Sequence, residues 1–233
     1  MEVIARIRND FPTKFGLPRQ SGLAPSLQSK IVFEPAYRVP EALRGLDGFS
    51  HIWLIWGFSE NCHSARSEES DHWQPTVRPP RLGGNVRMGV FATRSHFRPN
   101  PIGLSCVRLD SIVPDGGNGL VLIVSGADLM DGTPIYDIKP YLPGVDAHPD
   151  ATDGFVGTHA QVLLEVEIDP CLAARLAAAG LTGAQITTLR EILAQDPRPA
   201  YHATHADPAR VYGLAYAGHD IHFTVSDGHL KAF

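Results

Sequence analysis

Apolar residues recur along the first 145 residues in short runs that favour β-strands over helices. Alternating or continuously apolar runs occur at 3-VIARI-7, 30-KIVF-33, 49-FSHIWLIWGF-58, 86-VRMGVFA-92, 104-LSCVRLDSIV-113, 120-LVLIVSGA-127 and 135-IYDIKPYL-142. Gly- and Pro-rich segments separate them, which is typical of strands joined by sharp turns. The run 49–58 is apolar enough to predict burial on both faces. Because no helices alternate with these strands, a parallel sheet is not expected.

The sheet that these strands form is expected to close on itself. An open sheet leaves unpaired backbone groups along its edge strands and invites aggregation, whereas a closed barrel has no edges. The turn 114-PDGGNG-119 predicts a hairpin between two of the runs. We therefore expect a mainly β protein whose first domain, residues 1–145, is a single antiparallel β-barrel.

A second unit is expected after a Pro-, Gly-, Asp- and Ala-rich linker at 143–160. Asp169 followed by Pro170 is typical of a helix N-terminus. The expected elements are a strand at 161–168, a helix from Pro170 to Gly180, a helix whose apolar stripe is Ile186, Leu189, Ile192 and Leu193, and strands at 210–216 and 220–225. This pattern predicts a small α+β C-terminal domain over residues 161–233.

The composition limits the cellular and chemical context. The chain has 233 residues, three cysteines and a formal charge of −5. Cys62, Cys106 and Cys171 are odd in number and lack Cys-x-x-Cys spacing, which argues against a disulfide framework or a zinc knuckle. The longest apolar run, 52-IWLIWGF-58, is too short to span a bilayer, and the N-terminus lacks a signal-peptide core. We expect a soluble, cytoplasmic protein without a metal site or membrane association.

Arginine is concentrated in one segment of this net acidic chain. No Asp or Glu lies between His72 and Leu109, and this segment contains Arg78, Arg81, Arg87, Arg94, Arg98 and Arg108. Such segregation indicates an anionic partner at one surface, and guanidinium forks suit carboxylates and phosphates. The alternative is pairing with carboxylates elsewhere in the fold, which we expect for about two of the six.

Three polar segments are candidates for a binding site. In 94-RSHFRPNPIG-103, Pro99 and Pro101 stiffen the backbone around Asn100. A pre-ordered binding loop and a rigid barrel corner both explain this stiffness. The segments 14-KFGLPRQSG-22 and 195-QDPRPAY-201 are also stiff and polar, as binding loops often are.

The segment 131-DGTPIYDIKPYLP-143 adds candidate proton-transfer groups. Asp137 and Lys139 lie two residues apart on an expected strand, so both side chains face the same side. They form either a proton-handling pair or a salt bridge, and the salt bridge is the commoner case. The glycine groups at 82–85 and 115–119 lack the G-x-G-x-x-G pattern, so a Rossmann-type cofactor site is not expected.

Together these motifs resemble the tRNA threonylcarbamoyladenosine N6-methyltransferase family, the TsaA-like β-barrel methyltransferases. The resemblance is carried by 75-PTVRPPRLGGNVRMGVFATRSHFRPNPIG-103, 131-DGTPIYDIKPYLP-143, 194-AQDPRPAY-201, 17-LPRQSGL-23 and 45-GLDGFSHIWLI-55, and it covers nearly the whole chain. It implies an S-adenosylmethionine-dependent enzyme that works as a homodimer, with the cofactor near the subunit interface. The implied substrate is threonylcarbamoyladenosine beside the anticodon of tRNAs that read codons beginning with A.

The resemblance also implies the site residues. The implied cofactor contacts are Pro18, Arg19, Gln20, Ser59, Glu60, Arg94, Leu104, Asp131, Gly132, Thr133 and Pro134. Family members often have His at the position of Ser59. The chemistry requires removal of the N6 proton, for which Asp137 is the candidate base, with Lys139 or Tyr141 orienting it or the threonyl group. Asn100 is a candidate hydrogen-bond partner of the base or cofactor.

Other functions fit parts of the pattern. A non-catalytic RNA-binding module would use the same arginine face without binding a cofactor. A metal-dependent hydrolase would need the histidines and carboxylates, whose spacing is poor for a metal. A methyltransferase that acts on another modified RNA is a third possibility, because the loop 61–73 is longer and more acidic than we expect for the family.

Overall fold

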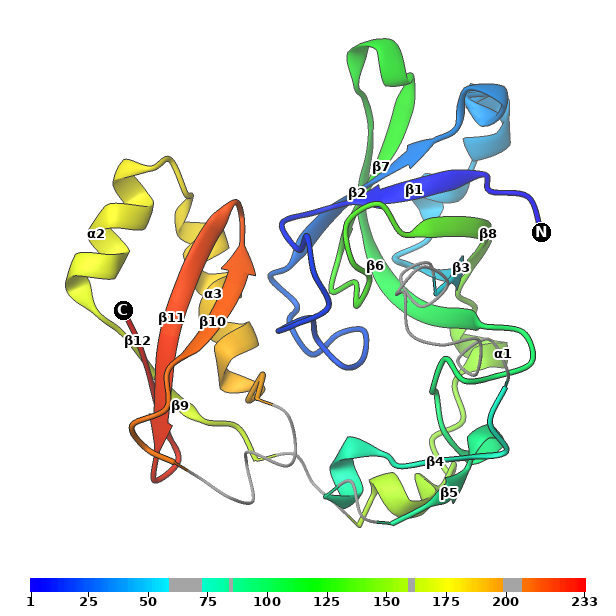
Figure 1. Ribbon diagram of the computed structural model, residues 1–233. Coiled ribbons are helices and arrows are strands. Elements are labelled where there is room, and N and C mark those ends of the chain that lie inside the picture. The colour runs from blue at the N-terminus through cyan, green and yellow to red at the C-terminus, as the bar shows by residue number, and fades with distance from the viewer. Residues whose placement is uncertain (59–72, 84–85, 159–161, 199–206) are drawn as a thin grey trace.

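The computed structural model describes residues 1–58, 73–83, 86–158, 162–198 and 207–233. Figure 1 shows a β-barrel on one side and a smaller α+β unit on the other. The barrel closes through antiparallel strands in the order β1-β2-β7-β6-β3-β8. The expected fold class, a mainly β protein with one antiparallel barrel and a small α+β region, is confirmed.

The barrel strands follow most of the apolar runs. They are β1 (Ala5–Arg8), β2 (Gln28–Phe33), β3 (His51–Gly57), β6 (Ile102–Pro114), β7 (Leu120–Ser125) and β8 (Pro134–Pro140). The expected hairpin joins β6 to β7. The register of β6 against β7 shifts between Leu109 and Ser111. Such a bulge bends a strand, so the long β6 can pair with both β3 and β7 around the barrel.

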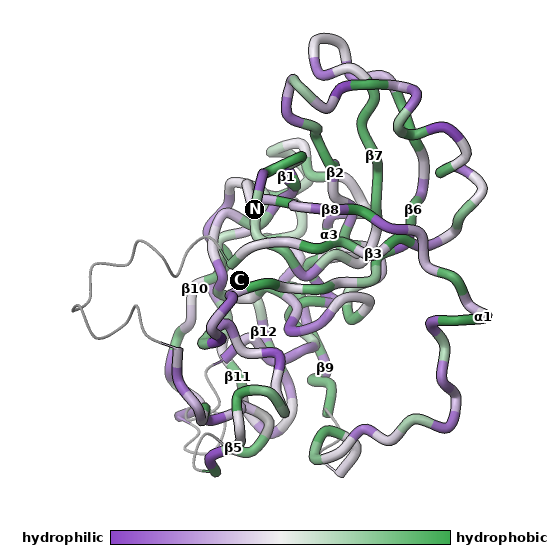
Figure 2. The backbone as a smooth tube through the Cα atoms, turned by 90° about the vertical axis from the view of Figure 1, so that its right-hand side faces the viewer, coloured by the Kyte–Doolittle hydropathy of each residue, from purple (hydrophilic) through white to green (hydrophobic). Residues whose placement is uncertain are grey.

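Side chains from alternate strand positions fill the barrel. Ile52 and Leu54 of β3 are fully buried, whereas Trp53 and Ile55, which alternate with them, are only partly buried. The expectation that 49–58 is buried on both faces is therefore wrong: the side chains that point out of the barrel stay partly exposed, although Trp53 packs against Tyr141. Figure 2 shows hydrophobic stretches along barrel strands such as β3 and β7.

The segment 86–92 is not a barrel strand, contrary to expectation. Only β5 (Met88–Gly89) is extended, and it pairs with β4 (Thr76–Val77) in a separate two-stranded sheet. Residues Val90–Ala92 turn into a 3₁₀ helix immediately afterwards. The turn is favoured because the Arg98 guanidinium donates hydrogen bonds to the carbonyl oxygens of Val90 and Thr93, at 3.0 and 2.7 Å.

The C-terminal unit packs two helices with a four-stranded sheet of order β10-β11-β12-β9. Its elements are β9 (Glu165–Ile168), α2 (Pro170–Ala178), α3 (Gly183–Ala194), β10 (Tyr212–Tyr216), β11 (His219–Ser226) and β12 (His229–Ala232). The Asp169 side chain caps α2 as expected, accepting from the N–H of Cys171 at 2.8 Å. The short β12 was not anticipated, because only Leu230 and Ala232 in it are apolar and buried.

The linker between the two units contains the short helix α1 (Pro143–Asp146) and a 3₁₀ helix at Gly154–Val156. Asp146 accepts hydrogen bonds from the Trp53 indole at 3.1 Å and from the N–H of Leu142 at 2.8 Å, which fixes α1 to the barrel. Among the described residues, no helix combines the length and apolar character needed to cross a membrane.

Candidate cofactor and RNA site

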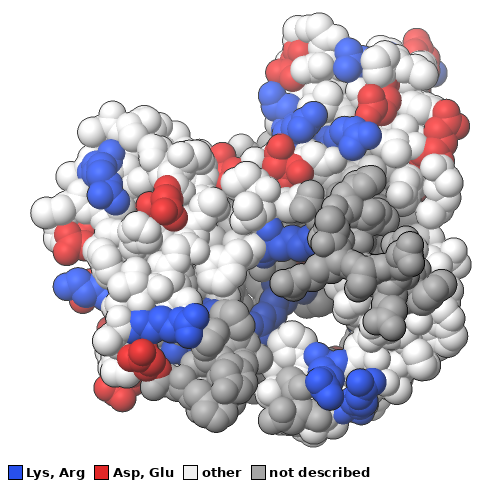
Figure 3. All heavy atoms as spheres, in the orientation of Figure 1, with Lys and Arg blue, Asp and Glu red and all other residues white. Residues whose placement is uncertain are grey.

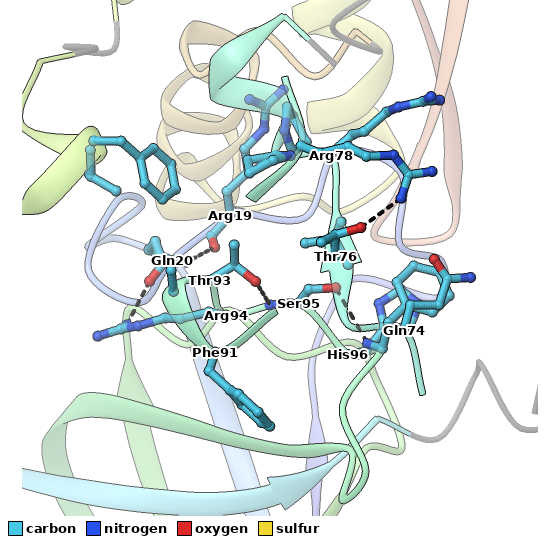
Figure 4. A pocket seen from close by; sticks show the side chains of 18 of the residues that line it. Arg19, Gln20, Gln74, Thr76, Arg78, Phe91, Thr93, Arg94, Ser95 and His96 are labelled. Atoms are coloured by element: carbon cyan, nitrogen blue, oxygen red, sulfur yellow. Dashed lines mark hydrogen bonds between the residues drawn. The ribbon is translucent and has the colours of Figure 1, made fainter. Parts of the chain in front are cut away.

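A cavity of about 1050 Å³ lies beside the β4–β5 sheet, at the upper end of the range for small-molecule sites. Four segments line most of it: Arg19 and Gln20, residues 74–80, residues 91–97, and residues 153–156. Arg19, Arg78, Arg87 and Arg94 all contribute to its wall. Figure 4 shows these polar side chains around the cavity. Figure 3 shows Lys and Arg side chains along the hollow between the two units.

Two of the expected binding loops meet in this cavity. The Arg94 guanidinium donates a 2.6 Å hydrogen bond to the side-chain oxygen of Gln20 (Figure 4). The Gln20 amide in turn donates to the carbonyl oxygen of Arg19, also at 2.6 Å. Arg19, Gln20 and Arg94, three of the expected cofactor contacts, therefore lie together although 74 positions separate Gln20 from Arg94 in the chain.

The loop that carries Arg94 is rigid because polar side chains tie its backbone. The Thr93 hydroxyl donates to the carbonyl of Val90 at 2.8 Å and accepts from the N–H of Ser95 at 3.3 Å. The two Arg98 hydrogen bonds described above hold the same turn from the other side. Arg98 thus has a structural role, whereas Arg94 lines the cavity and extends towards Gln20 (Figure 4).

Of the other arginines in the segment 72–109, some line the cavity and some make structural contacts. The Arg87 guanidinium donates to the Thr76 hydroxyl at 2.7 Å while lining the cavity. Arg108 forms an ion pair with Asp110 at 2.8 Å on the barrel. The alternative of carboxylate pairing therefore holds for Arg108, and Arg78, Arg87 and Arg94 supply positive charge to the cavity.

A carboxylate that the sequence analysis did not single out lies beside Arg94. Asp128 accepts a 2.5 Å hydrogen bond from the Ser105 hydroxyl, which accepts one at 3.0 Å from the Trp56 indole. The backbone of Ser21 also hydrogen-bonds to Asp128. Burial raises the pKa of Asp128, while Ser105 and the positive charge of Arg94 oppose this without cancelling it. In the sequence, the only sign was an acidic residue between the buried Ala127 and Leu129.

Asp128→Asn is expected to be more stable than the parent protein at pH 7. A raised folded-state pKa means that the contribution of Asp128 to stability is fully present below the ordinary Asp pKa and is lost as the pH rises through the folded-state value. Asparagine stays neutral and keeps an oxygen for the Ser105 hydroxyl. The difference in Tm between Asp128→Asn and the parent protein should therefore grow as the pH rises and vanish in acid. A difference in Tm that does not change with pH would contradict this prediction.

Asp115 is a control for this experiment, because its pKa is shifted in the opposite direction from that of Asp128. Hydrogen bonds from Asn118 at 2.9 Å and Lys30 at 3.0 Å lower the pKa of Asp115. Its contribution to stability is present above the ordinary Asp pKa and is lost as the pH falls through the folded-state value. Asp115→Asn should therefore be less stable than the parent at pH 7, with a gap that closes in acid. Thermal unfolding at several pH values checks both signs.

Aromatic side chains form an exposed surface at the cavity. Phe91 lines the cavity and is 70% exposed, and Trp73 beside it is 48% exposed. Their rings lie 6.2 Å apart with an angle of 21° between planes, and the Arg98 guanidinium lies 5.4 Å from the Phe91 ring. Exposed aromatic rings beside arginines are typical of sites where nucleobases stack.

His96 is a further lining residue that the sequence analysis did not assign. Burial and the neighbouring Lys14 lower the pKa of His96, which favours the neutral imidazole. Its ring packs 4.0 Å from Phe97 and 5.8 Å from Phe58. His96 therefore contributes an uncharged wall between the arginines.

The other expected cofactor contacts lie elsewhere. Pro18 is buried and does not line the cavity, and Leu104 is on the outer face of β6 with 52% of its surface exposed. Residues 131–134 form the junction that leads from β7 into β8 and lies beside the end of β1. The Asp131 carboxylate accepts from the N–H of Asn9 at 3.1 Å, and Thr133 is buried. Gly132 and Pro134 belong to the same junction. Ser59 and Glu60 lie outside the described residues.

None of the four expected catalytic residues lines the cavity: Asp137, Lys139 and Tyr141 are on or next to β8, and Asn100 lies just before β6. Asp137 and Lys139 form the ion pair that their spacing allowed, at 2.9 Å, with both side chains substantially exposed. The Tyr141 ring packs 5.7 Å from the Trp53 ring. Asn100 is exposed, and its carbonyl accepts from the N–H of Ile102 at 2.8 Å. Among the described residues, none of these groups lines the cavity that contains Arg94.

In the described part of the segment 195–201, Gln195 bonds to the carbonyl of Leu23 outside the segment, whereas Arg198 pairs with Asp196 inside it. The Arg198 side chain forms two hydrogen bonds with the Asp196 carboxylate, at 2.8 and 2.9 Å, and Arg198 is buried. Asp196 adopts a positive φ of 52°, so this turn has a specific backbone shape. Among the described residues, no group of His, Cys, Asp and Glu side chains is arranged to hold a metal ion.

Comparisons with known proteins agree over the whole length of the chain. The model of the tRNA-methyltransferase O N-terminal domain matches residues 6–147, and that of the TrmO C-terminal domain matches residues 161–232. The tRNA (adenine(37)-N6)-methyltransferase of Escherichia coli K12 is 39% identical over 233 residues, covering 100% of this chain and 95% of that protein. The enzyme of the same name from Eikenella corrodens is 46% identical over 180 residues, covering 77% and 93%. A crystal structure of TrmO from Pseudomonas aeruginosa matches with a TM-score of 0.76 and 32% identity, covering 99% and 94%.

Proposed function

Because the chain belongs to the tRNA-methyltransferase O family, we propose that it methylates N6 of the adenosine beside the anticodon of tRNA, using S-adenosylmethionine. The observation that carries this proposal is the arginine-lined cavity in which Arg94 meets Gln20. The cavity is large enough for a nucleoside cofactor, and its charge suits an RNA backbone. The exposed Phe91 adds a surface on which a base can stack.

The residues of the cavity fit the cofactor. When bound, S-adenosylmethionine supplies a methyl group activated by its sulfonium. The Arg94 guanidinium and the Gln20 amide suit the carboxylate of its methionine part, and the partly buried Asp128 beside them places a negative charge near the ammonium group. The remaining proposed contacts are Pro18, Arg19, Ser59, Glu60, Leu104, Asp131, Gly132, Thr133 and Pro134.

We assign the chain two domains, a cofactor-binding barrel over residues 1–145 and a small α+β domain over residues 161–233. We also assign a homodimer in the cytoplasm, where tRNA is modified. The exposed Leu104 on the outer face of β6 and the separation of Asp137 from the Arg94 cavity both support a site completed by a second subunit. A dimer would bring the Arg94 side of one copy to the β8 side of the other.

In this site the protein has mainly to align N6 of the base with the methyl group and to accept one proton. Asp137 is the proposed base, since the carbamoyl group makes the N6 proton more acidic than in adenosine. Lys139, paired with Asp137 at 2.9 Å, keeps this carboxylate oriented. Tyr141 and Asn100 are proposed to contact the threonyl group and the base.

The substrate is tested with one tRNA in two forms, with and without the threonylcarbamoyl group. Incubation with S-adenosylmethionine should add one methyl group to threonylcarbamoyladenosine, measured by mass spectrometry of nucleoside digests. The unmodified form should gain none. Equal methylation of both forms would reject the threonylcarbamoyl requirement, and cofactor binding without methylation of either would indicate another modified RNA. RNA binding without cofactor binding would favour the non-catalytic module.

A further inference from the structure

The hydrophobic core of the C-terminal domain includes side chains from the N-terminal part of the chain. Phe11, Ala24 and Leu27 precede or follow the loop that carries Arg19 and Gln20, and each is at most 1% exposed. They belong to the same buried cluster as residues of α2, α3, β10, β11 and β12. The Phe11 ring lies 5.3 Å from the ring of Tyr216 on β10. The loop is thus packed at both ends into the C-terminal domain.

Polar contacts from α3 hold the backbone of the same loop. The Glu191 carboxylate accepts two hydrogen bonds from Ser26, one from its N–H at 3.0 Å and one from its hydroxyl at 2.9 Å. The Gln195 amide donates to the carbonyl of Leu23 at 3.1 Å. On the other side, the Gln185 amide donates to the Asp10 carboxylate at 2.9 Å. Loop 9–27 is therefore anchored by Gln185 and Glu191 of α3 and by Gln195 at the C-terminal cap of this helix.

The middle of the loop also lies against the C-terminal domain. Gly16 has a φ of +84°, and a Cβ there would clash with the Leu214 side chain on β10. Arg19 lines the large cavity and also a smaller one of about 260 Å³, whose wall includes Gln195 and Arg198. The segment that contacts the proposed cofactor on one face is thus supported by the C-terminal domain on the other.

We propose that the C-terminal domain is a positioning element that holds loop 9–27 in its cofactor-binding shape, with Glu191 as the principal polar anchor. This rests on the proposed cofactor site at Arg19, Gln20 and Arg94. A loop that contains Gly16 and Gly22 gains many conformations when it is released. If only a fraction of molecules holds the binding shape, the apparent Kd for the cofactor rises by the inverse of that fraction.

Glu191→Ala tests the inference on the full-length protein. It should weaken S-adenosylmethionine binding about tenfold by isothermal titration, the affinity equivalent of one hydrogen bond to a charged group. It should also speed hydrogen exchange of two loop amides, those of Gly22 and Leu17. These amides donate to the carbonyls of Gly126 and Lys14, at 2.8 and 3.2 Å. Glu191→Gln keeps an acceptor for Ser26. It should therefore restore most of the cofactor affinity and most of the protection of the two amides from exchange.

Arg190→Ala is the matched control on the same helix. Arg190 donates to the carbonyl of Val166 at 2.7 Å, a contact inside the C-terminal domain. The Arg190→Ala variant should have a less stable C-terminal domain. Hydrogen exchange of the loop amides and the affinity for S-adenosylmethionine should stay unchanged. Equal effects of Arg190→Ala and Glu191→Ala on the cofactor would overturn the inference, because general loosening of the domain would then explain both. If Glu191→Ala does not fold, Ser26→Ala removes the hydroxyl donor from the loop side and should show a smaller change of the same kind.

The exchange measurement separates failure of this inference from failure of the proposed cofactor site. Unchanged exchange in Glu191→Ala would show that α3 does not hold the loop, wherever the cofactor binds. Faster exchange with unchanged cofactor affinity would show that the loop is held but is not the cofactor loop. That second result overturns the positioning role and counts against the assignment of Arg19 and Gln20 as well.

Discussion

Arg94→Ala should reduce the affinity for S-adenosylmethionine roughly hundredfold, about the loss of a charge-assisted contact to a carboxylate. Arg94 lines the cavity, and its guanidinium donates to the Gln20 side chain at 2.6 Å. Its removal also leaves the partly buried Asp128 without its nearby positive charge. The loop itself should persist, since Arg98 and Thr93 maintain the turn. Isothermal titration with the cofactor, in the absence of RNA, measures the effect.

Two variants make this result specific. Arg175→Ala removes the same charge from the exposed last turn of α2 and should leave cofactor affinity unchanged. Arg94→Lys keeps the charge but loses the planar fork, so it should recover only part of the affinity. If the Kd of Arg94→Ala for the cofactor stays within about twofold of the parent value, the methionine carboxylate binds elsewhere. The loss of one hydrogen bond to a charged group would change the Kd by much more than about twofold.

The different roles of Arg94 and Arg98 could not be predicted from the sequence. Both are arginines of one short loop, and the concentration of arginine correctly indicated a positively charged surface there. The sequence could not show that Arg98 bonds to the carbonyls of Val90 and Thr93 while Arg94 lines the cavity. That choice depends on the 3₁₀ turn at 90–92, which forms where a strand was expected.

The barrel was easier to predict than the site, for a physical reason. Burial of alternate side chains leaves a local pattern in each strand, as in β3 with Ile52 and Leu54. The Asp128–Ser105–Trp56 chain of hydrogen bonds joins three strands or loops and leaves no local pattern. The same is true of Glu191 and Ser26, which are 165 positions apart. Family resemblance supplied Arg19 and Gln20, which composition and periodicity alone would not have separated from other loop residues.

The positions of the expected residues also bear on how the site is assembled. Arg19, Gln20 and Arg94 share a cavity, whereas Asp137 and Lys139 lie on β8 outside it. If a homodimer unites the two groups, cofactor binding and proton removal can be altered separately. Variants of Arg94 should then act mainly on cofactor affinity, and variants of Asp137 mainly on turnover.

Asp137→Asn provides the sharpest test of this separation. If Asp137 accepts the N6 proton, kcat should fall by about 10²- to 10⁴-fold, the usual contribution of a positioned base, while the affinities for cofactor and tRNA stay near those of the parent. Asparagine keeps an oxygen for the N–H of Ile138, which now donates to Asp137 at 2.9 Å. The lost ion pair with Lys139 is exposed and contributes little to stability. Single-turnover kinetics with threonylcarbamoylated tRNA isolates the chemical step.

Lys139→Gln distinguishes a base from a merely structural ion pair. It breaks the same 2.9 Å contact but leaves the Asp137 carboxylate in place, so the loss in kcat should be much smaller than in Asp137→Asn. Equal losses would mean that the pair acts as one structural unit. Full turnover by Asp137→Asn with unchanged tRNA binding would exclude Asp137 as the base. The acidified N6 proton would then leave to solvent or to another group, and alignment of the base with the methyl donor would account for the catalysis.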